Sequence, residues 1–231
     1  MMKQKDNQKH QLITLHEPKS VISEKFRGIR SNLLFSSADE TIKGIVVTAE
    51  KPSAGKSTIA SNLAITYAQA GYKTLIIDGD MRKPTLHYIF NKMNNHGLSS
   101  TIINNIKLED SIEETEIENL DILTSGPIPP NPSELIGSSN FNEIISTLKD
   151  RYNFIVLDTP PVNTVTDAQI YSKYITHSIL VIDAEKNNRT EITKAKSLLD
   201  RVDSKILGVV LNRTPKDKSS SYYAYYGSED K

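Results

Sequence analysis

Cysteine is absent from this chain of 231 residues. Disulfides and thiolate metal sites are therefore excluded, and a reducing cytoplasm is compatible with the sequence without being proved by it. The five histidines are scattered without the spacing of metal ligands, so we interpret them as ordinary surface or loop residues.

An excess of charge of one sign and long apolar segments are missing as well. Lys plus Arg and Asp plus Glu both number 28, which argues against a protein held on nucleic acid mainly by global charge. No apolar run approaches the roughly 20 residues that span a bilayer, and the polar start lacks the apolar centre of a signal peptide. We therefore expect a soluble protein with no nucleic-acid partner and no direct membrane insertion, whose membrane association comes through a partner.

The segment that organises the chain is Gly44 to Thr58, which reads GIVVTAEKPSAGKST. An apolar strand, a loop of small residues and a helix opened by Gly-Lys-Ser-Thr form the context of a phosphate-binding P-loop. Free N–H groups of the loop and helix start bind an anion. Lys56 would then reach the β- and γ-phosphates, and the Ser57 hydroxyl would lie on Mg²⁺. Glu50 stands where the strict pattern has its first glycine, and an ordinary strand-to-helix turn is the alternative.

Short apolar runs alternate with predicted helices along the rest of the chain. Near-continuous apolar runs are typical of strands covered on both faces. The pattern predicts a doubly wound α/β domain with a mainly parallel sheet. Besides the strand before the P-loop, we expect strands at about 73–78, 119–123, 154–158, 179–183 and 206–211.

Three aspartates follow or end such strands. Asp78 and Asp80 stand at the end of one strand and Asp158 ends another. Ligands of parallel α/β sheets bind at the carboxyl ends of strands, so these carboxylates should meet the P-loop. Phosphates and carboxylates repel each other unless a cation such as Mg²⁺ lies between them. Asp158 is the expected Walker B group, Asp80 would share that duty, and Asp78 would orient or deprotonate an attacking hydroxyl. Any one of them alone is equally compatible with a helix cap or a turn.

The two ends of the chain differ from its middle. Residues 1–17 are polar and expected to be disordered, and a helix is predicted at about 20–37. Glu24, Arg27 and Arg30 lie off its apolar stripe and form either a solvated face or an interface. Residues 215–231 are rich in serine and hold four of the ten tyrosines: Tyr222, Tyr223, Tyr225 and Tyr226. Such a tail should be mobile, although tyrosines packed back on the body are an alternative.

These segments together resemble the bacterial tyrosine kinases (BY-kinases). Residues 50–58 resemble their deviant Walker A loop, 78–82 their Walker A′ motif and 154–160 their Walker B motif. Residues 24–30 resemble the oligomerisation motif Glu-x-x-Arg-x-x-Arg, and the tyrosine cluster resembles the autophosphorylation tail. The likeness covers nearly the whole chain after residue 17, and it is to the soluble kinases of capsular polysaccharide synthesis in Gram-positive bacteria.

The resemblance implies a single P-loop kinase domain over residues 18–214, with an N-terminal oligomerisation helix and a flexible tail from residue 215. It implies Lys56 on the phosphates of ATP, Ser57, Asp80 and Asp158 around Mg²⁺, and Asp78 as the base. A homo-oligomeric ring through Glu24, Arg27 and Arg30, a membrane adaptor that activates the kinase and a phosphatase are implied too, with a cytoplasmic location at the inner face of the membrane. The expected ATP-binding residues are Lys51, Ser53, Ala54, Gly55, Lys56, Ser57, Thr58 and, from the resemblance to related ATPases alone, Asn212.

The sequence therefore predicts an ATP-dependent protein-tyrosine kinase that phosphorylates its own tail, most readily on a neighbouring subunit. The alternative is a non-kinase ATPase switch of the partitioning or division-site type. Lys51 keeps that alternative open, because such switches carry a lysine at this loop position. A tyrosine cluster has no evident use in a switch, which favours the kinase.

Overall fold

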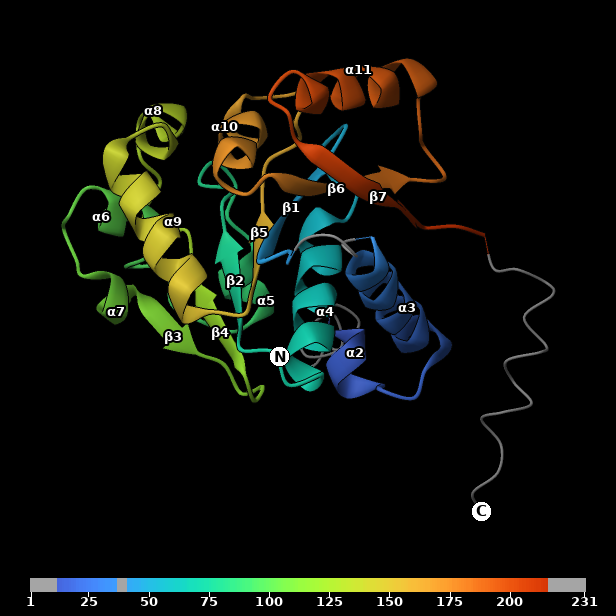
Figure 1. The fold of residues 1–231 in the computed structure, drawn as a ribbon, viewed down its shortest axis with the longest axis horizontal. Helices are drawn as coiled ribbons and strands as arrows, with labels where there is room; N and C mark the ends of the chain where they lie inside the picture. The colour runs from blue at the N-terminus through green and yellow to red at the C-terminus, as the bar shows by residue number, and fades with distance from the viewer. Residues whose placement is uncertain (1–11, 37–40, 216–231) are drawn as a thin grey trace.

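The computed structural model describes residues 12–36 and 41–215. Their core is a seven-stranded sheet in the order β3-β4-β2-β5-β1-β6-β7 (Figure 1). All neighbouring strands pair in parallel except β3 and β4, which are antiparallel. The strands are β1 (Gly44–Ala49), β2 (Thr74–Asp78), β3 (Ile112–Glu114), β4 (Leu120–Leu123), β5 (Phe154–Asp158), β6 (His177–Asp183) and β7 (Lys205–Asn212). The predicted mainly parallel α/β architecture is confirmed.

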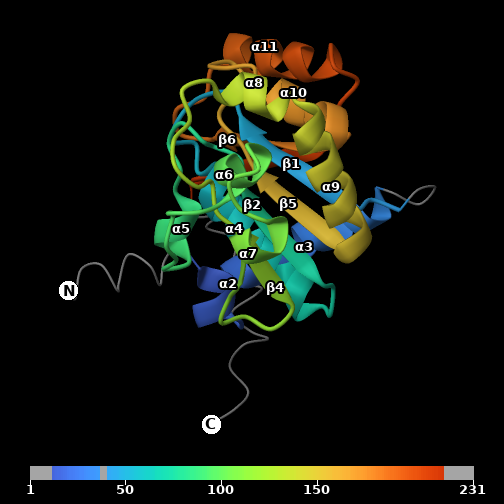
Figure 2. The same cartoon turned by 90° about the vertical axis from the view of Figure 1, so that its left-hand side faces the viewer.

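Helices cover both faces of this sheet (Figure 2). They are α2 (Ile13–His16), α3 (Val21–Phe35), α4 (Lys56–Gln69), α5 (Leu86–Ile89), α6 (Leu98–Ile102), α7 (Leu108–Ser111), α8 (Pro132–Ile136), α9 (Ser139–Arg151), α10 (Asp167–Tyr174) and α11 (Arg189–Asp200). Successive strand side chains point to opposite faces. In β5, Phe154 and Val156 accordingly pack with α4, whereas Ile155 and Leu157 pack with α9 and α10. This division explains why the strands are apolar on both sides.

Helix α4 is the innermost helix and starts at the P-loop. All of its residues from Ile59 to Ala68 are buried, because α2 and α3 cover the side that faces away from the sheet. The aromatic ring of Tyr67 stacks on Phe154 of β5, with ring centroids 3.7 Å apart. The helix that presents the phosphate-binding residues is therefore held on all sides by the core.

The prediction that residues 1–17 are disordered is wrong for residues 12–17, while residues 1–11 lie outside the described part of the chain. Leu12 is buried, and α2 packs beside α4. The backbone N–H and the hydroxyl of Thr14 both donate to Asn62 Oδ1, at 3.0 and 2.8 Å. Gln69 Nε2 donates to the Thr14 carbonyl at 3.1 Å. Polar partners on α4 thus fix a segment whose own sequence looks like a linker.

Caps and turns follow the sequence in most places. Ser20 and Asn188 accept hydrogen bonds from backbone N–H groups at the starts of α3 and α11. Helix α8 begins at Pro132, and the side chain of Asn131 before it bonds to the Glu134 carboxylate and does not cap the helix. Among the described helices, none is both long and apolar enough to cross a membrane. The tail tyrosines lie outside the described residues.

Candidate active site

The loop between β1 and α4 has the backbone geometry that a P-loop needs. Gly55 precedes α4 with a φ of +99°, a left-handed conformation that favours glycine. A Cβ at Gly55 would lie 2.2 Å from Nδ2 of Asn212, which itself donates to the Ala54 carbonyl at 2.8 Å. The end of β7 is therefore tied to the loop, and Asn212 lies beside the P-loop.

A cavity of about 530 Å³ lies over this loop. Most of the predicted residues line it: Ser53, Gly55, Lys56, Ser57, Thr58 and Asp80. Lys51 does not line it, because its ammonium group donates to the Lys186 carbonyl and lies 3.7 Å from the Glu50 carboxylate. The structure thus brings together the core of the predicted phosphate site. The predicted residues that do not line the cavity are Lys51, Ala54, Asp78, Asp158 and Asn212.

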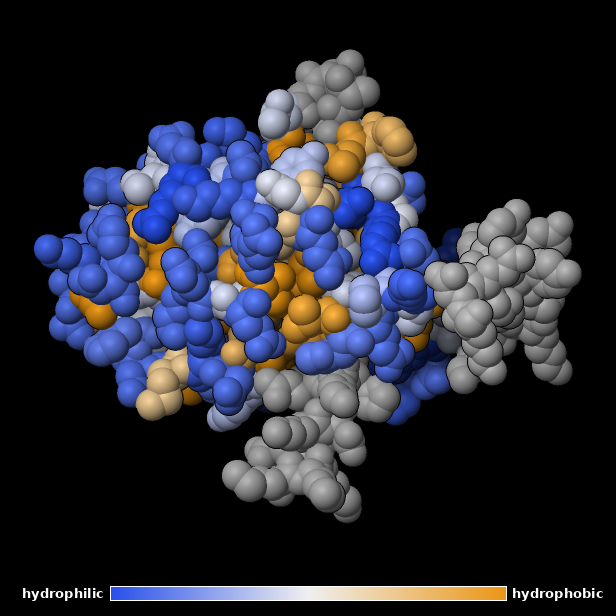
Figure 3. Space-filling view, turned by 90° about the horizontal axis from the view of Figure 1, so that it is seen from below, coloured by the Kyte–Doolittle hydropathy of each residue, from blue (hydrophilic) through white to orange (hydrophobic). Residues whose placement is uncertain are grey.

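A larger cavity of about 720 Å³ lies at the amino ends of β1, β2 and β5. Aromatic side chains such as Tyr67, Tyr72 and Tyr152 line it, and the described residues around it include no P-loop residue and no strand-end carboxylate. Figure 3, which views the molecule from below, shows apolar side chains gathered over the middle of that face with hydrophilic ones around them. This cavity is the larger of the two, but the residues that can bind phosphate, which are those of the P-loop, line the smaller one.

The two carboxylates that end β2 and β5 lie side by side, because Asp78 and Asp158 are register partners. Both residues are fully buried. Neither carboxylate oxygen of Asp158 has a hydrogen bond of good geometry within the described chain, although the Ser57 hydroxyl and the Thr159 N–H are near enough to lower its pKa. Oδ2 of Asp78 accepts the N–H groups of Thr85 and Leu86, each at 2.9 Å, and Oδ1 accepts the Asp80 N–H at 3.3 Å. Asp78 therefore fixes the start of α5, whereas Asp158 has acceptor capacity to spare.

Burial dominates the electrostatics of the three carboxyl groups. It raises the pKa of Asp158 to about 6, with the Lys56 ammonium group opposing the shift. It raises the pKa of Asp78 well above its usual range, and the neighbouring Asp158 raises it further. The pKa of Asp80 is raised by burial too, while the Lys83 N–H bond and Lys56 lower it. Each shift means that the site favours a proton or a cation at these oxygens.

This donor set fits Mg²⁺. Carboxylate and hydroxyl oxygens are the ligands that this ion takes at nucleotide sites, usually together with waters and phosphate oxygens. The unpartnered oxygens of Asp158 are buried acceptors of the kind that a cation would satisfy. The Ser57 hydroxyl lies near these carboxylates, since it accepts a 2.9 Å hydrogen bond from the hydroxyl of Thr85, whose N–H bonds to Asp78.

Several residues that the sequence analysis left out lie at the cavity. Arg82, Thr85, Tyr88 and Arg213 line it. Arg82 donates from Nε and Nη2 to the buried carboxylate of Asp167, at 3.0 and 3.1 Å. Arg82 belongs to the segment that resembles Walker A′, which is a signal that could have found it. Its partner lies 85 residues away and carries no sequence signal.

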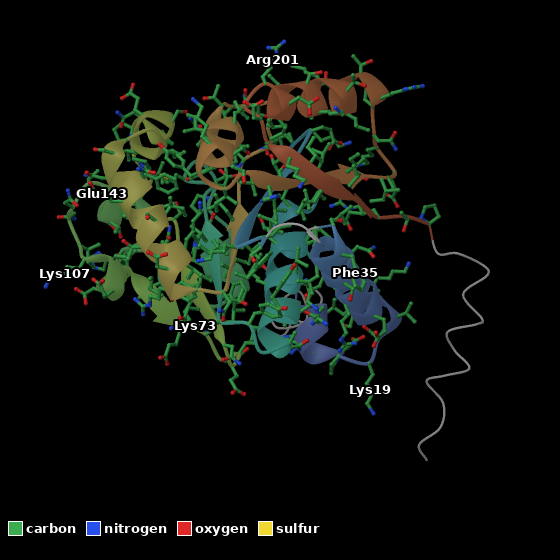
Figure 4. The ribbon with its side chains drawn as sticks, in the orientation of Figure 1. Lys19, Phe35, Lys73, Lys107, Glu143 and Arg201 are labelled. Atoms are coloured by element: carbon green, nitrogen blue, oxygen red, sulfur yellow. The ribbon has the colours of Figure 1, made fainter. Side chains whose placement is uncertain are left out.

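The three charged residues of α3 are not equivalent. Arg27 pairs with Glu24 and donates to the Pro18 carbonyl at 2.7 Å, within its own segment. Arg30 instead donates to the Thr66 carbonyl of α4 at 2.5 Å. Lys19, just before α3, points away from the body in Figure 4, and Phe35 at the end of α3 is exposed. Glu24 and Arg27 thus lie on the surface, whereas Arg30 joins α3 to α4.

Comparison with known proteins gives consistent matches. A family model described as AAA domain matches residues 42–187. The putative tyrosine-protein kinase CapB of Staphylococcus aureus is 62% identical over 213 residues, which cover 92% of this chain and 93% of CapB. The tyrosine-protein kinase YwqD of Bacillus subtilis strain 168 is 42% identical and aligns over 95% of this chain and 92% of YwqD.

Solved structures give the same picture. The crystal structure of the chimerical protein CapA2B2 superposes with a TM-score of 0.88 and 60% identity, over 90% of this chain and 91% of that one. The septum site-determining protein MinD of Pyrococcus horikoshii OT3, complexed with Mg-ADP, superposes less well, with a TM-score of 0.65 and 28% identity over 76% of this chain and 72% of that one. The similarity to tyrosine-protein kinases is therefore both higher and more complete than the similarity to this division-site protein.

Proposed function

The chain belongs to the bacterial tyrosine kinases, within the AAA domain family, and we propose that this tyrosine-protein kinase transfers the γ-phosphoryl group of ATP to tyrosines of its own tail. The observation that carries the proposal is that Asp80 lines one cavity with the P-loop, while the buried Asp78 accepts the Asp80 N–H and lies beside Asp158. The expected acceptors are Tyr222, Tyr223, Tyr225 and Tyr226.

Positioning and charge neutralisation carry most of the catalysis of phosphoryl transfer. The N–H groups of the P-loop and the ammonium group of Lys56 would hold the phosphates. Ser57, Asp80 and Asp158 would hold Mg²⁺, directly or through water. When bound, Mg²⁺ neutralises charge that develops on the phosphate oxygens. Asn212, which is tied to the loop, would contact the adenine of the nucleotide.

Asp78 remains our candidate for the base. Its Oδ1 accepts only the 3.3 Å bond from Asp80, so that atom has room for the phenol proton while Oδ2 anchors α5. The phenol oxygen would bond to the γ-phosphorus as the bond to the β-phosphate oxygen breaks and ADP leaves. Asp78 is buried and does not line the cavity, whereas Asp80 does. The acceptor would therefore have to pass the Asp80 side chain to reach Asp78. Asp78→Asn should lower kcat while leaving ATP affinity unchanged, and an unaffected kcat would limit Asp78 to holding α5.

We propose that transfer occurs between neighbouring subunits, because an assembly would bring the tail of one subunit to the cavity of the next. Arg213, which precedes the tail, lines the cavity of its own subunit, so the mixing experiment below separates this route from transfer within one subunit. Helix α3 supports an assembly, because Val21, Ile22, Leu34 and Phe35 are large apolar residues that it leaves exposed beside Glu24 and Arg27. We propose a homo-oligomeric ring through this helix. Alanine at Glu24, Arg27 and Arg30 should lower the assembly mass by light scattering, and an unchanged mass would refute the interface.

Phosphorylation should work against this assembly. Each phosphate adds about −1.5 to −2 charges at neutral pH, so four on one tail add roughly −6 to −8. Repulsion in a ring should expel the tails and weaken contacts, and the effect should shrink at high salt. A phosphatase would reset the cycle. Phosphorylated chains that remain assembled at low salt would contradict this part of the proposal.

We further propose that the kinase acts in the cytoplasm, at the inner face of the membrane, with a membrane adaptor that activates it in the synthesis of capsular or other exported polysaccharide. The names of its relatives support the kinase activity, and the adaptor and the membrane setting rest on the resemblance to the family. Deleting the adaptor should release the kinase from the membrane fraction and lower its phosphotyrosine. If neither changes, the adaptor proposal fails. The alternative of a non-kinase switch has less support, because the division-site neighbour matches less well.

A mixing experiment tests transfer and acceptor together. One chain carries Lys56→Met with an intact tail, and the other is active but has phenylalanine at all four tail tyrosines. In verified mixed oligomers with Mg-ATP, the inactive chain should become labelled on its tail. If it stays unlabelled while the unmodified chain labels itself, transfer between subunits is refuted.

A further inference from the structure

One side chain at the cavity has no part in the mechanism above. Tyr88 lies on α5 and is 74% exposed, yet it lines the same cavity as Lys56 and Asp80. Large aromatic residues left this exposed are uncommon in the described chain, where Phe35 of α3 is the other one. An exposed ring at the edge of a phosphate site is a surface on which a second substrate can pack.

Tyr88 approaches the cavity from the side of the sheet opposite to β7. Asn212, which bonds to the P-loop carbonyl of Ala54, comes from β7 at one edge of the sheet. Tyr88 comes from the segment after β2, which lies on the other side of β1 in the order β2-β5-β1-β6-β7. Thr85, three residues earlier, bonds to Ser57, the residue expected to lie beside the terminal phosphates. A group that attacks the γ-phosphorus would therefore pass Tyr88.

The backbone under this ring is anchored. Asp78 holds the first N–H groups of α5, and the neighbouring side chains Leu86 and Ile89 are buried in the core. The ring of His87 lies 3.9 Å from that of Tyr88, centroid to centroid, at 42°. Because the helix is fixed in this way, Tyr88 can contact a ligand with little further ordering.

Apolar residues from another segment line the same cavity. Pro160, Pro161 and Val165 follow β5, between the Walker B aspartate and α10. The cavity thus combines a polar region, with Lys56 and Asp80, and an aromatic and apolar region. A phenol matches that combination, since its ring is apolar and its hydroxyl is polar.

We infer that Tyr88 forms a wall of the acceptor subsite, where the ring of the incoming tyrosine packs against the ring of Tyr88 and its hydroxyl points to the phosphates. The contact favours tyrosine over serine, because the short serine side chain has no ring to place there. This inference rests on the proposed transfer to tyrosine. An aromatic pair changes a binding constant by roughly 2- to 12-fold.

The test uses the full chain with its four tail tyrosines changed to phenylalanine, so that it does not label its own tail. The acceptor is a peptide that copies residues 216–231, at saturating Mg-ATP. Tyr88→Ala should raise the KM for the peptide by roughly 2- to 12-fold and leave the KM for ATP unchanged. Tyr88→Phe, which keeps the ring, should behave like the parent. Met93→Ala is the control, because Met93 is 72% exposed and does not line the cavity.

The outcomes separate this inference from the proposed function. An unchanged peptide KM in Tyr88→Ala, with an active parent, overturns the wall and leaves the kinase proposal intact. A rise in the peptide KM in Tyr88→Phe as large as that in Tyr88→Ala overturns the wall too, because the hydroxyl and not the ring would then make the contact. Phosphate found on Tyr88 of the parent would make it a substrate and not a wall. A parent that labels no tyrosine peptide refutes both proposals.

Discussion

Replacing Asp158 with asparagine should stabilise the chain at neutral pH when no nucleotide or metal is present. Burial raises the pKa of Asp158 from 3.8 in a model compound to about 6 in the folded chain. A raised folded-state pKa means that the stability contributed by the protonated form is fully present below pH 3.8 and is lost as the pH rises through about 6. This rise in the pKa of Asp158, by about two pH units, lowers the free energy of unfolding by roughly 3 kcal/mol at pH 7.5. Asparagine keeps the shape and never ionises, so it avoids this cost.

Urea unfolding in the presence of a chelator measures the effect. At pH 7.5 the free energy of unfolding of Asp158→Asn should exceed that of the parent by up to about 3 kcal/mol, and at pH 5 by about half of that. Asp200→Asn is the matched control, because Asp200 is half-exposed and pairs only with Lys196 on the surface. That control should change stability by less than about 1 kcal/mol at either pH.

Mg-ATP should make the parent more stable than Asp158→Asn. A ligand that binds only the folded state stabilises it in proportion to the logarithm of its concentration. The parent should gain from Mg-ATP, whereas Asp158→Asn should gain much less because it lacks a ligand for the cation. If Asp158→Asn is the less stable chain at pH 7.5 without metal, the carboxylate has favourable partners and this reasoning is refuted.

Two further predictions concern the fold around the site. A Cβ at Gly97 would lie 2.3 Å from the Thr124 carbonyl oxygen, so Gly97→Ala should lower the free energy of unfolding by about 3 kcal/mol or more. A Cβ at Gly28 of α3 would meet no atom of the described chain, so Gly28→Ala should raise the free energy of unfolding by about 0.5–1 kcal/mol. Equal effects of the two in urea unfolding would contradict the packing described here. Arg30→Ala should cost about 1–2 kcal/mol because its guanidinium bonds the Thr66 carbonyl, and an unchanged midpoint in dilute, monomeric protein would show that this bond contributes nothing.

Much of the site could be predicted because its residues follow strands with strong patterns. The apolar run of β5 ends at Asp158 and that of β2 at Asp78, and parallel strands bring such ends to one edge of the sheet. The glycine before Lys56 marks the turn into α4, where the structure has a left-handed residue. Local pattern and sheet geometry were sufficient for these positions.

Long-range partners explain what the sequence could not supply. Helix α2 is too short to show periodicity, and Thr14 is held by Asn62, 48 residues away. The sequence does not distinguish Arg30 from Glu24 and Arg27, because its partner, the Thr66 carbonyl, lies on α4. The cavity face of Tyr88 depends on how Asp78 holds α5, which no spacing in the sequence indicates. The first two cases depend on hydrogen bonds between segments distant in the chain, and the third on side-chain hydrogen bonds across seven and eight residues.

The central claim is that the cavity over the P-loop transfers phosphate from Mg-ATP to tyrosine. Intact-mass measurement of the full chain after incubation with Mg-ATP tests it most directly, with Lys56→Met as the matched variant because methionine keeps the bulk and removes the cation. The parent should gain whole phosphoryl groups, mapped to Tyr222, Tyr223, Tyr225 and Tyr226, while Lys56→Met gains none. A parent that hydrolyses ATP without gaining mass, or a Lys56→Met chain that gains as much, would contradict the claim.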